Sequence, residues 1–120
     1  MLHNLCRKLL PPLFLSLFWI AVPAVAIELQ KGWWVVLGSF ADPDLSSPQE
    51  EKIARVRTQA ARCGFEAFND FSNKFLGFAP GYDVVVLGAF PSKYRAEAVL
   101  NTVKPCVPGA YIKFARHAGE

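Results

Sequence analysis

Apolar and polar positions follow the same pattern twice along this chain. The run VVLGSF at Val35 to Phe40 returns as VVLGAF at Val85 to Phe90. Each run is followed by apolar residues at helical spacing and then by a shorter apolar run. Runs of this kind indicate strands and the spaced pattern indicates a helix, so the order is β-α-β twice. The repeat therefore predicts a split βαβ pair, a single sheet with two helices on one face.

Four strands are expected, and the third contains three consecutive valines, which suits a central position in the sheet. Strand alternation turns Val35, Leu37, Val85 and Leu87 toward the helices, and it leaves Trp34, Val36, Tyr82, Val84 and Val86 on the opposite face. The predicted strands are Trp33 to Phe40, Phe65 to Asp70, Tyr82 to Phe90 and Ala110 to Phe114.

Two amphipathic helices follow the first and third strands. Ser47 is predicted as the N-cap of the first, with Pro48 at the first helical position and Glu50 completing a capping box. Pro91-Ser92 begins the second. The expected core-facing positions are Ile53, Val56, Ala60 and Cys63 in the first helix, and Ala96, Val99, Leu100 and Val103 in the second.

The first 26 residues have the composition of an export signal. Arg7 and Lys8 precede an apolar stretch from Leu9 to Val22, and Ala24 to Ala26 fits a cleavage site. The mature protein is then expected to be periplasmic or secreted, and to contact a membrane only if the leader stays uncleaved as an anchor. The predicted segments are a signal peptide at 1–26, a short lead-in at 27–32, a domain at 33–116 and a flexible tail at 117–120.

Charge argues against one class of partner. The chain has 13 Lys and Arg against 10 Asp and Glu, a net charge of +3. Two of the basic residues, Arg7 and Lys8, lie in the leader, which leaves +1 on the mature protein. Clustered Lys and Arg supply most of the affinity for phosphates, so no nucleic-acid partner is expected.

Cys63 and Cys106 remain after the leader, and an even number of cysteines in an oxidising compartment suggests a disulfide. Both lie near the C-terminal ends of the predicted helices. In a split βαβ pair these helices run antiparallel, so their ends should lie far apart. A bridge needs Cα atoms within about 7 Å, whereas a helix of a dozen residues is about 18 Å long. Two separate buried thiols are therefore favoured over a disulfide.

Motifs in both halves point to a family. Leu-Gly-Ser-Phe ends the first strand, Leu-Gly-Ala-Phe ends the third before a Ser-Lys-x-x-Ala-Glu helix, and Gly109 to Lys113 forms the last strand. From Trp33 to about Arg116 the chain resembles the SPOR domain. The resemblance implies an α+β fold, a ferredoxin-like split βαβ-βαβ with a four-stranded antiparallel sheet and two helices on one face. It also implies a bacterial envelope domain that binds peptidoglycan, in particular glycan strands without stem peptides, and that often acts in cell division.

In that family the ligand lies on the sheet face opposite the helices. Family members often have Gln where this chain has Val36, and a polar or basic residue where it has Val84, so the face is unusually apolar here. Trp34 and Tyr82 would be stacking platforms for sugar rings. The candidate ligand-binding residues, carried over by position or by strand alternation, are Trp34, Val36, Ser39, Tyr82, Val84 and Ile112.

An apolar sheet face also has two other interpretations. The connection from Phe71 to Gly81 is rich in phenylalanine and could fold across the face, which would leave no groove. Alternatively, the exposed face could bind an envelope protein or a second copy of the chain, which would make the domain a protein–protein docking module.

No catalytic or metal-binding pattern is predicted. Asp42, Asp44 and Asp70 match no calcium loop and are expected to be solvated turn residues. His117 is the only histidine after the leader, and no partners for a zinc site or a Ser/His/Asp triad accompany it. We therefore expect no enzymatic activity, no cofactor and no metal.

Overall fold

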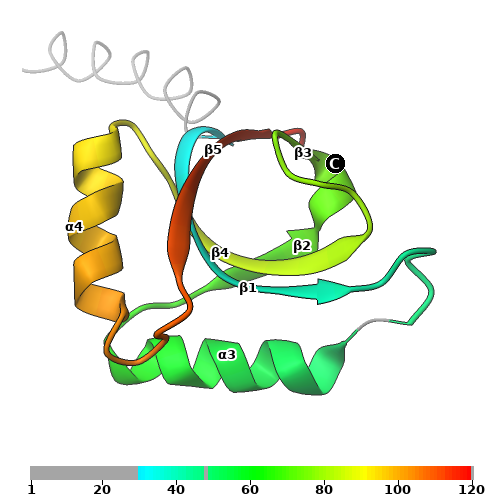
Figure 1. Cartoon of the computed structure of the whole chain (residues 1–120), viewed down its shortest axis with the longest axis horizontal. Coiled ribbons are helices and arrows are strands. Elements are labelled where there is room, and N and C mark those ends of the chain that lie inside the picture. Colours follow the sequence, from blue (N-terminus) through cyan, green and yellow to red (C-terminus); the bar gives the residue numbers. More distant parts are fainter. Residues whose placement is uncertain (1–29, 48, 120) are drawn as a thin grey trace, which may run out of the picture.

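The computed structural model describes residues 30–47 and 49–119, and it is an antiparallel sheet with two helices (Figure 1). The helices are α3 (Glu50–Arg62) and α4 (Lys93–Val103), and a short 3-10 helix lies at Ser72–Lys74. None of the described helices is long and apolar enough to cross a membrane. In the order β2-β4-β1-β5-β3, the five strands are β1 (Lys31–Ala41), β2 (Phe68–Phe71), β3 (Phe75–Leu76), β4 (Tyr82–Phe90) and β5 (Tyr111–His117).

The predicted α+β class, antiparallel sheet and two helices are confirmed, but the sheet has five strands rather than four. The additional strand is β3, where Phe75 pairs with His117 and Leu76 with Arg116. This strand forms because the connection after β2, predicted as a loop, folds back onto the sheet. The bounds of β4 agree with the prediction, whereas β1 and β5 are longer than expected.

The sheet separates two hydrophobic cores, and strand alternation correctly predicted on which side of the sheet the buried residues of β1 and β4 lie. The first core lies between the sheet and the helices, and it contains Val35, Leu37, Val85 and Leu87 together with Ile53, Ala60, Ala96 and Val103. The second core lies on the opposite face and contains Trp34, Val36, Phe75, Val84, Val86 and Ala115. The described residues thus contain both cores of the domain.

The sheet is strongly curled, so the face away from the helices is enclosed (Figure 1). Although β4 and β1 lie between β2 and β5 in the sheet, Asp70 of β2 contacts His117 of β5 at 3.0 Å. The β1–β4 register shifts between Trp33 and Val35 and again between Val36 and Gly38. Such irregularities bend a strand and increase its twist, which accounts for the curl.

The predicted flexible tail at 117–120 is wrong where it begins, because His117 belongs to a strand and Ala118 is hydrogen-bonded to the connection after β2. β5 continues through His117, and the Ala118 N–H donates to the carbonyl of Lys74 at 2.7 Å. The predicted lead-in is also shorter than expected, because β1 already begins at Lys31. The predicted signal peptide lies outside the described residues.

The start of α3 differs from its prediction. The N-cap position is Gln49 rather than Ser47, and no side chain caps it. Instead, Asp83 Oδ2 accepts the N–H of Gln49 at 3.0 Å, and Asp42 Oδ1 accepts the N–H of Ser47 at 3.1 Å. Two carboxylates from the ends of neighbouring strands thus replace the predicted capping box. The predicted start of α4 at Pro91-Ser92 is confirmed, since Ser92 is the N-cap and its Oγ accepts the N–H of Arg95 at 3.1 Å.

Cys63 and Cys106 form a disulfide, with Cα atoms 6.1 Å apart, so the favoured prediction of two separate thiols is wrong. The two helices cross steeply instead of running antiparallel, and both end at the same corner of the domain (Figure 1). Cys63 directly follows α3, and Cys106 lies one turn beyond α4. Closing a loop with a sequence separation of 43 removes about 4 kcal/mol of chain entropy from the unfolded state.

Removing this disulfide should destabilise the domain. We expect the double substitution Cys63→Ser with Cys106→Ser to lower the free energy of unfolding by about 2–4 kcal/mol. For a domain of this size, each kcal/mol corresponds to roughly 4–8 °C in Tm. Thermal unfolding followed by circular dichroism measures the change, and added reductant should produce a similar loss in the wild type but none in the variant. An unchanged Tm would contradict this.

We expect the stability of the domain to require glycine at position 88, where β4 passes close to Trp33 and Trp34. Its φ is +136°, and a Cβ there would lie 3.1 Å from both the Trp33 carbonyl oxygen and the Trp34 ring. We expect Gly88→Ala to lower the stability by about 1–3 kcal/mol. Gly109→Ala is the matched control, because nothing lies within 4 Å of its Cβ position, and it should change Tm little. Equal Tm values for the two variants would contradict the prediction.

Candidate functional site

The six predicted ligand-binding residues do not form one exposed surface. Trp34, Val36 and Val84 are buried, none more than 4% exposed. Ile112 lies on the helix side of the sheet, since it pairs with Val35 and packs against the first core. Ser39 and Tyr82 are exposed, as a ligand-binding role requires.

The segment after β2 covers most of the face opposite the helices. Phe75 lies edge-on to Trp34 with ring centroids 5.1 Å apart, and Phe78 stacks on Phe75 at 4.6 Å. Trp34 Nε1 donates to the carbonyl of Ala115 at 3.0 Å, which satisfies its polar group inside the core. The interpretation that the connection folds across the face is confirmed, but its consequence, a face without a groove, is wrong. Trp34 is therefore a core residue rather than an exposed stacking platform.

One part of this face remains open as a pocket of about 290 Å³. We call it the tyrosine pocket, because Tyr82 and Tyr111 both line it. Four of the six predicted residues line it: Val36, Ser39, Tyr82 and Val84. The remaining lining residues are Phe78, Ala79, Tyr111 and Lys113.

Sequence reasoning missed Tyr111 and Lys113. They flank Ile112 on β5, and in a strand neighbouring residues point to opposite faces. The missing information was the register of β5 against β1. With that register, strand alternation selects Tyr111 and Lys113 in place of Ile112. In that register Tyr111 pairs with Val36 and Lys113 pairs with Trp34.

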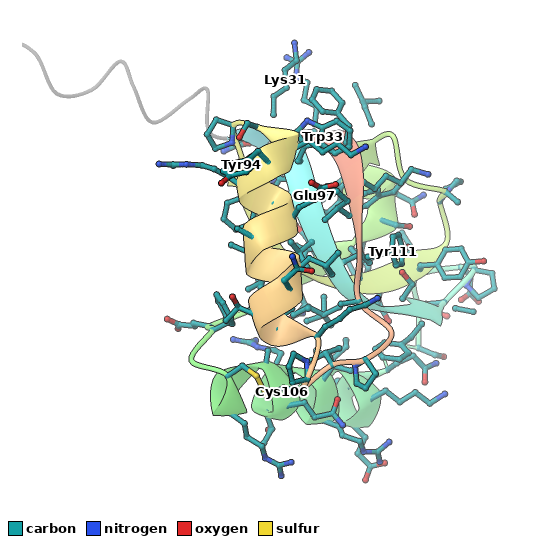
Figure 2. All side chains as sticks on the ribbon, turned by 60° about the vertical axis from the view of Figure 1, so that its left-hand side comes forward. Lys31, Trp33, Tyr94, Glu97, Cys106 and Tyr111 are labelled. Carbon is teal, nitrogen blue, oxygen red and sulfur yellow. A yellow bond between two sulfur atoms is a disulfide. The ribbon has the colours of Figure 1, made fainter. Side chains whose placement is uncertain are left out.

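The tyrosine pocket has apolar walls at Val36 and Val84, and polar groups on its exposed residues. Tyr111 is 49% exposed (Figure 2), and Tyr82 is also exposed. Ser39 offers a hydroxyl and Lys113 an ammonium group, and within the described ranges Lys113 has no ion pair. Aromatic rings with nearby hydrogen-bonding groups suit a ligand with one apolar face and polar edges, as a pyranose ring has.

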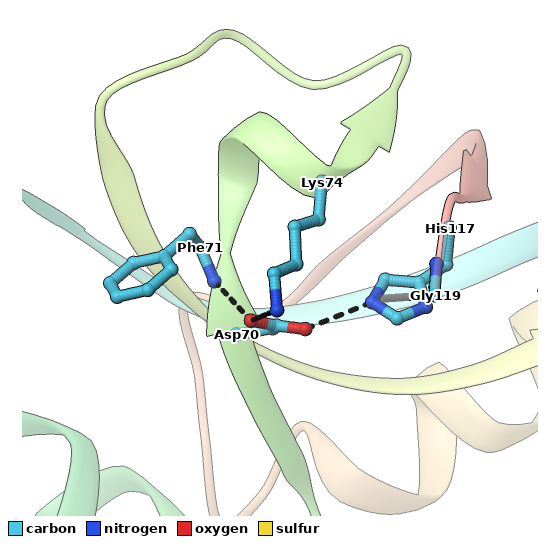
Figure 3. A network of polar contacts seen from close by, with 5 residues as sticks. All are labelled: Asp70, Phe71, Lys74, His117 and Gly119. Atoms are coloured by element: carbon cyan, nitrogen blue, oxygen red, sulfur yellow. Dashed lines mark hydrogen bonds and ion pairs between the residues drawn. The ribbon is translucent and has the colours of Figure 1, made fainter. Parts of the chain in front are cut away.

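A network around Asp70 fastens the covering segment to the sheet (Figure 3). Asp70 contacts His117 at 3.0 Å and Lys74 at 3.3 Å, and it accepts the Phe71 N–H at 2.8 Å. His117 Nδ1 accepts the Gly119 N–H at 3.2 Å, so Nε2 is the nitrogen that donates to Asp70. Burial alone would raise the pKa of Asp70, but these partners outweigh it and hold the pKa below its ordinary value. The network holds β2, the segment after it and β5 together, and so keeps the curled sheet closed.

Asp42 and Asp83 form a buried carboxyl pair beside the start of α3. The pKa of Asp83 is raised, first by burial and then by the neighbouring charge of Asp42, despite the hydrogen bond from Gln49. Asp42 Oδ2 has no hydrogen-bond partner among the described residues. A proton shared between the two carboxyl groups would satisfy that oxygen.

Of the three aspartates expected to be solvated turn residues, Asp44 is exposed and Asp70 is half-buried, but Asp42 is buried, so the expectation is wrong for Asp42. No group of three His, Cys, Asp or Glu residues in the described part of the chain could hold a metal ion. A larger open hollow of about 640 Å³ lies between α3 and β2, but none of the six predicted residues lines it. Within it, Arg57 donates to Asn69 at 2.8 Å, so two of its polar groups bind each other.

No protein-family model matches this chain, and no curated protein or solved structure is significantly similar to it. The resemblance to the SPOR domain therefore stays a prediction that rests on the strand-end motifs.

The two carboxyl sites should have opposite effects on stability. We expect Asp83→Asn to stabilise the domain at pH 7 by about 1 kcal/mol, because its amide can accept from Gln49 and donate to Asp42. Asp70→Asn should destabilise it by about 1–2 kcal/mol, because the charged partner of His117 and Lys74 is lost. Urea unfolding of both variants and the wild type measures these differences.

The pH dependence follows from the two pKa directions. A raised folded pKa of Asp83 means that its contribution is present below pH 3.8 and is lost as the pH rises through the folded value. The gain in Asp83→Asn should therefore disappear in acid. A lowered folded pKa of Asp70 means that its contribution is present above pH 3.8 and is lost as the pH falls. A destabilised Asp83→Asn at pH 7 would contradict the expected gain from removing a buried charge beside Asp42.

Proposed function

We propose that the described residues form a non-catalytic, exported, SPOR-like domain that binds peptidoglycan, in particular glycan strands lacking stem peptides. Its binding site is the tyrosine pocket. The order β2-β4-β1-β5 of the four longer strands supports the ferredoxin-like part of the proposal. The domain works by binding and positioning, with no reaction at the site.

One observation carries the proposal. Four residues expected from the sequence as ligand contacts line a single pocket, and they come from two separate strands: Val36 and Ser39 from β1, and Tyr82 and Val84 from the start of β4. Because the pocket also has Tyr111 and Lys113, it retains polar groups despite the two valines. A sugar would stack on an exposed tyrosine and receive hydrogen bonds from Ser39 and Lys113.

The disulfide supports the predicted location. Disulfides persist in oxidising compartments such as the bacterial periplasm and are rare in the cytosol. A bridge between Cys63 and Cys106 is therefore consistent with the export signal read from the first 26 residues, and with a periplasmic or secreted domain.

The alternative function, a protein–protein docking module, is less well supported than glycan binding. A docking module was expected to use an exposed apolar sheet face, but Trp34, Val84 and Val86 on that face are buried. An envelope protein could still bind the domain elsewhere, but no exposed apolar sheet face on the described residues favours that function over glycan binding.

Co-sedimentation with purified peptidoglycan sacculi tests the proposal. We expect the domain to be retained more strongly after an amidase has removed the stem peptides. Tyr111→Ala should weaken binding about 2- to 13-fold, since one aromatic contact contributes about 0.5–1.5 kcal/mol. Tyr94→Ala is the matched control, because Tyr94 is 80% exposed on α4 and does not line the pocket. No retention on either material would overturn the proposed function.

A further inference from the structure

A second exposed surface lies at the end of the sheet where the chain enters β1. Trp33 of β1 pairs with Phe114 of β5, and their rings meet edge-on with centroids 5.4 Å apart. Phe114 is 46% exposed. Figure 2 shows Lys31, Trp33 and Tyr94 at this same end. We call this surface the β1-entry patch, and it consists of Lys31, Trp33, Lys93, Tyr94, Phe114 and Arg116.

Three cations of the β1-entry patch surround the aromatic pair. Lys31 pairs directly with Arg116 across β1 and β5, two residues along from Trp33 and Phe114. Lys93 Nζ lies 5.5 Å from the centre of the Trp33 ring. None of these three cations forms an ion pair with the residues that the structure describes.

The pairing of Lys31 with Arg116 needs an explanation. Like charges directly opposite each other on neighbouring strands are destabilising, and here a third cation lies on the adjacent tryptophan. Glu97, one turn along α4 from Lys93, is the acidic side chain labelled near this end (Figure 2). An external anionic partner would offset the repulsion that remains.

We propose that the β1-entry patch docks on an anionic phospholipid surface. Each Lys or Arg near such a surface strengthens the attraction to it, and aromatic side chains favour the boundary between headgroups and acyl chains. A small soluble anion would use the cations but would leave Phe114 and Tyr94 in water. A lipid surface uses both kinds of side chain.

The position of the patch along the chain supports this partner. The apolar run of the leader ends at Val22, nine residues before Lys31. At about 3.5 Å per residue, the patch can be no more than about 30 Å from that run. Whenever the leader occupies a bilayer, during export or as an anchor, the β1-entry patch is the end of the domain nearest to the membrane. The patch gives the domain affinity for that surface even after the leader is cleaved.

Vesicle co-sedimentation of the described domain tests this inference independently of glycan binding. We expect at least 10-fold stronger binding to vesicles of phosphatidylglycerol and phosphatidylcholine than to vesicles of phosphatidylcholine alone, and a loss of that preference at high salt. The emission of Trp33 should shift to shorter wavelength on binding. A Trp33→Phe variant, which keeps the buried Trp34, should lack the shift.

Substitutions distinguish binding through the β1-entry patch from binding through net positive charge anywhere on the domain. Lys31→Glu with Arg116→Glu should lower binding to the anionic vesicles at least 10-fold, and Phe114→Ser should lower it as well. Lys52→Glu with Arg55→Glu is the matched control, since it makes the same charge change on exposed positions of α3. Tm values of all variants confirm that they fold.

Three results would overturn the inference. The first is equal binding to both kinds of vesicle. The second is an equal loss in the control variant on α3. The third is full competition by millimolar inorganic phosphate, which would make the patch a site for soluble anions. Because peptidoglycan is absent from this experiment, its outcome is independent of the proposed glycan binding.

Discussion

The contact between Trp34 and Phe75 determines the character of the whole domain. A sheet with helices on one face leaves its other face open to water or to a ligand. Here the chain after β2 places Phe75 edge-on to Trp34, and the sheet curls around this pair to form a second core. Small domains bury a modest fraction of their surface, so a second core is a large part of the stability available to this one.

The second core accounts for the apolar side chains of Val36 and Val84. Both are buried against the covering segment. Apolar side chains stabilise a site that is closed to water, whereas polar groups there would need partners. Any ligand must therefore rely on the exposed residues of the tyrosine pocket, chiefly Tyr82, Tyr111 and Lys113.

Local patterns predicted the elements and the two faces of the sheet, because residue spacing alone decides which side chains share a face. The faces on which Val35 and Leu87 lie, and the buried positions of both helices, needed no long-range information. The features that were missed depend on contacts between distant segments. The disulfide depends on how steeply α3 and α4 cross. Pairing of Phe75 with His117 depends on the curl, which brings residues 42 positions apart together.

The same reasoning applies to the candidate sites. Strand alternation identified the face of the tyrosine pocket, but only the register of β5 separates Tyr111 and Lys113 from Ile112. β1 links the two proposed surfaces, since Lys31 at its start belongs to the β1-entry patch and Ser39 near its end lines the tyrosine pocket. A rigid central strand keeps the two surfaces apart. A domain that rests on a bilayer at one end of β1 would therefore present the tyrosine pocket toward the other end of that strand.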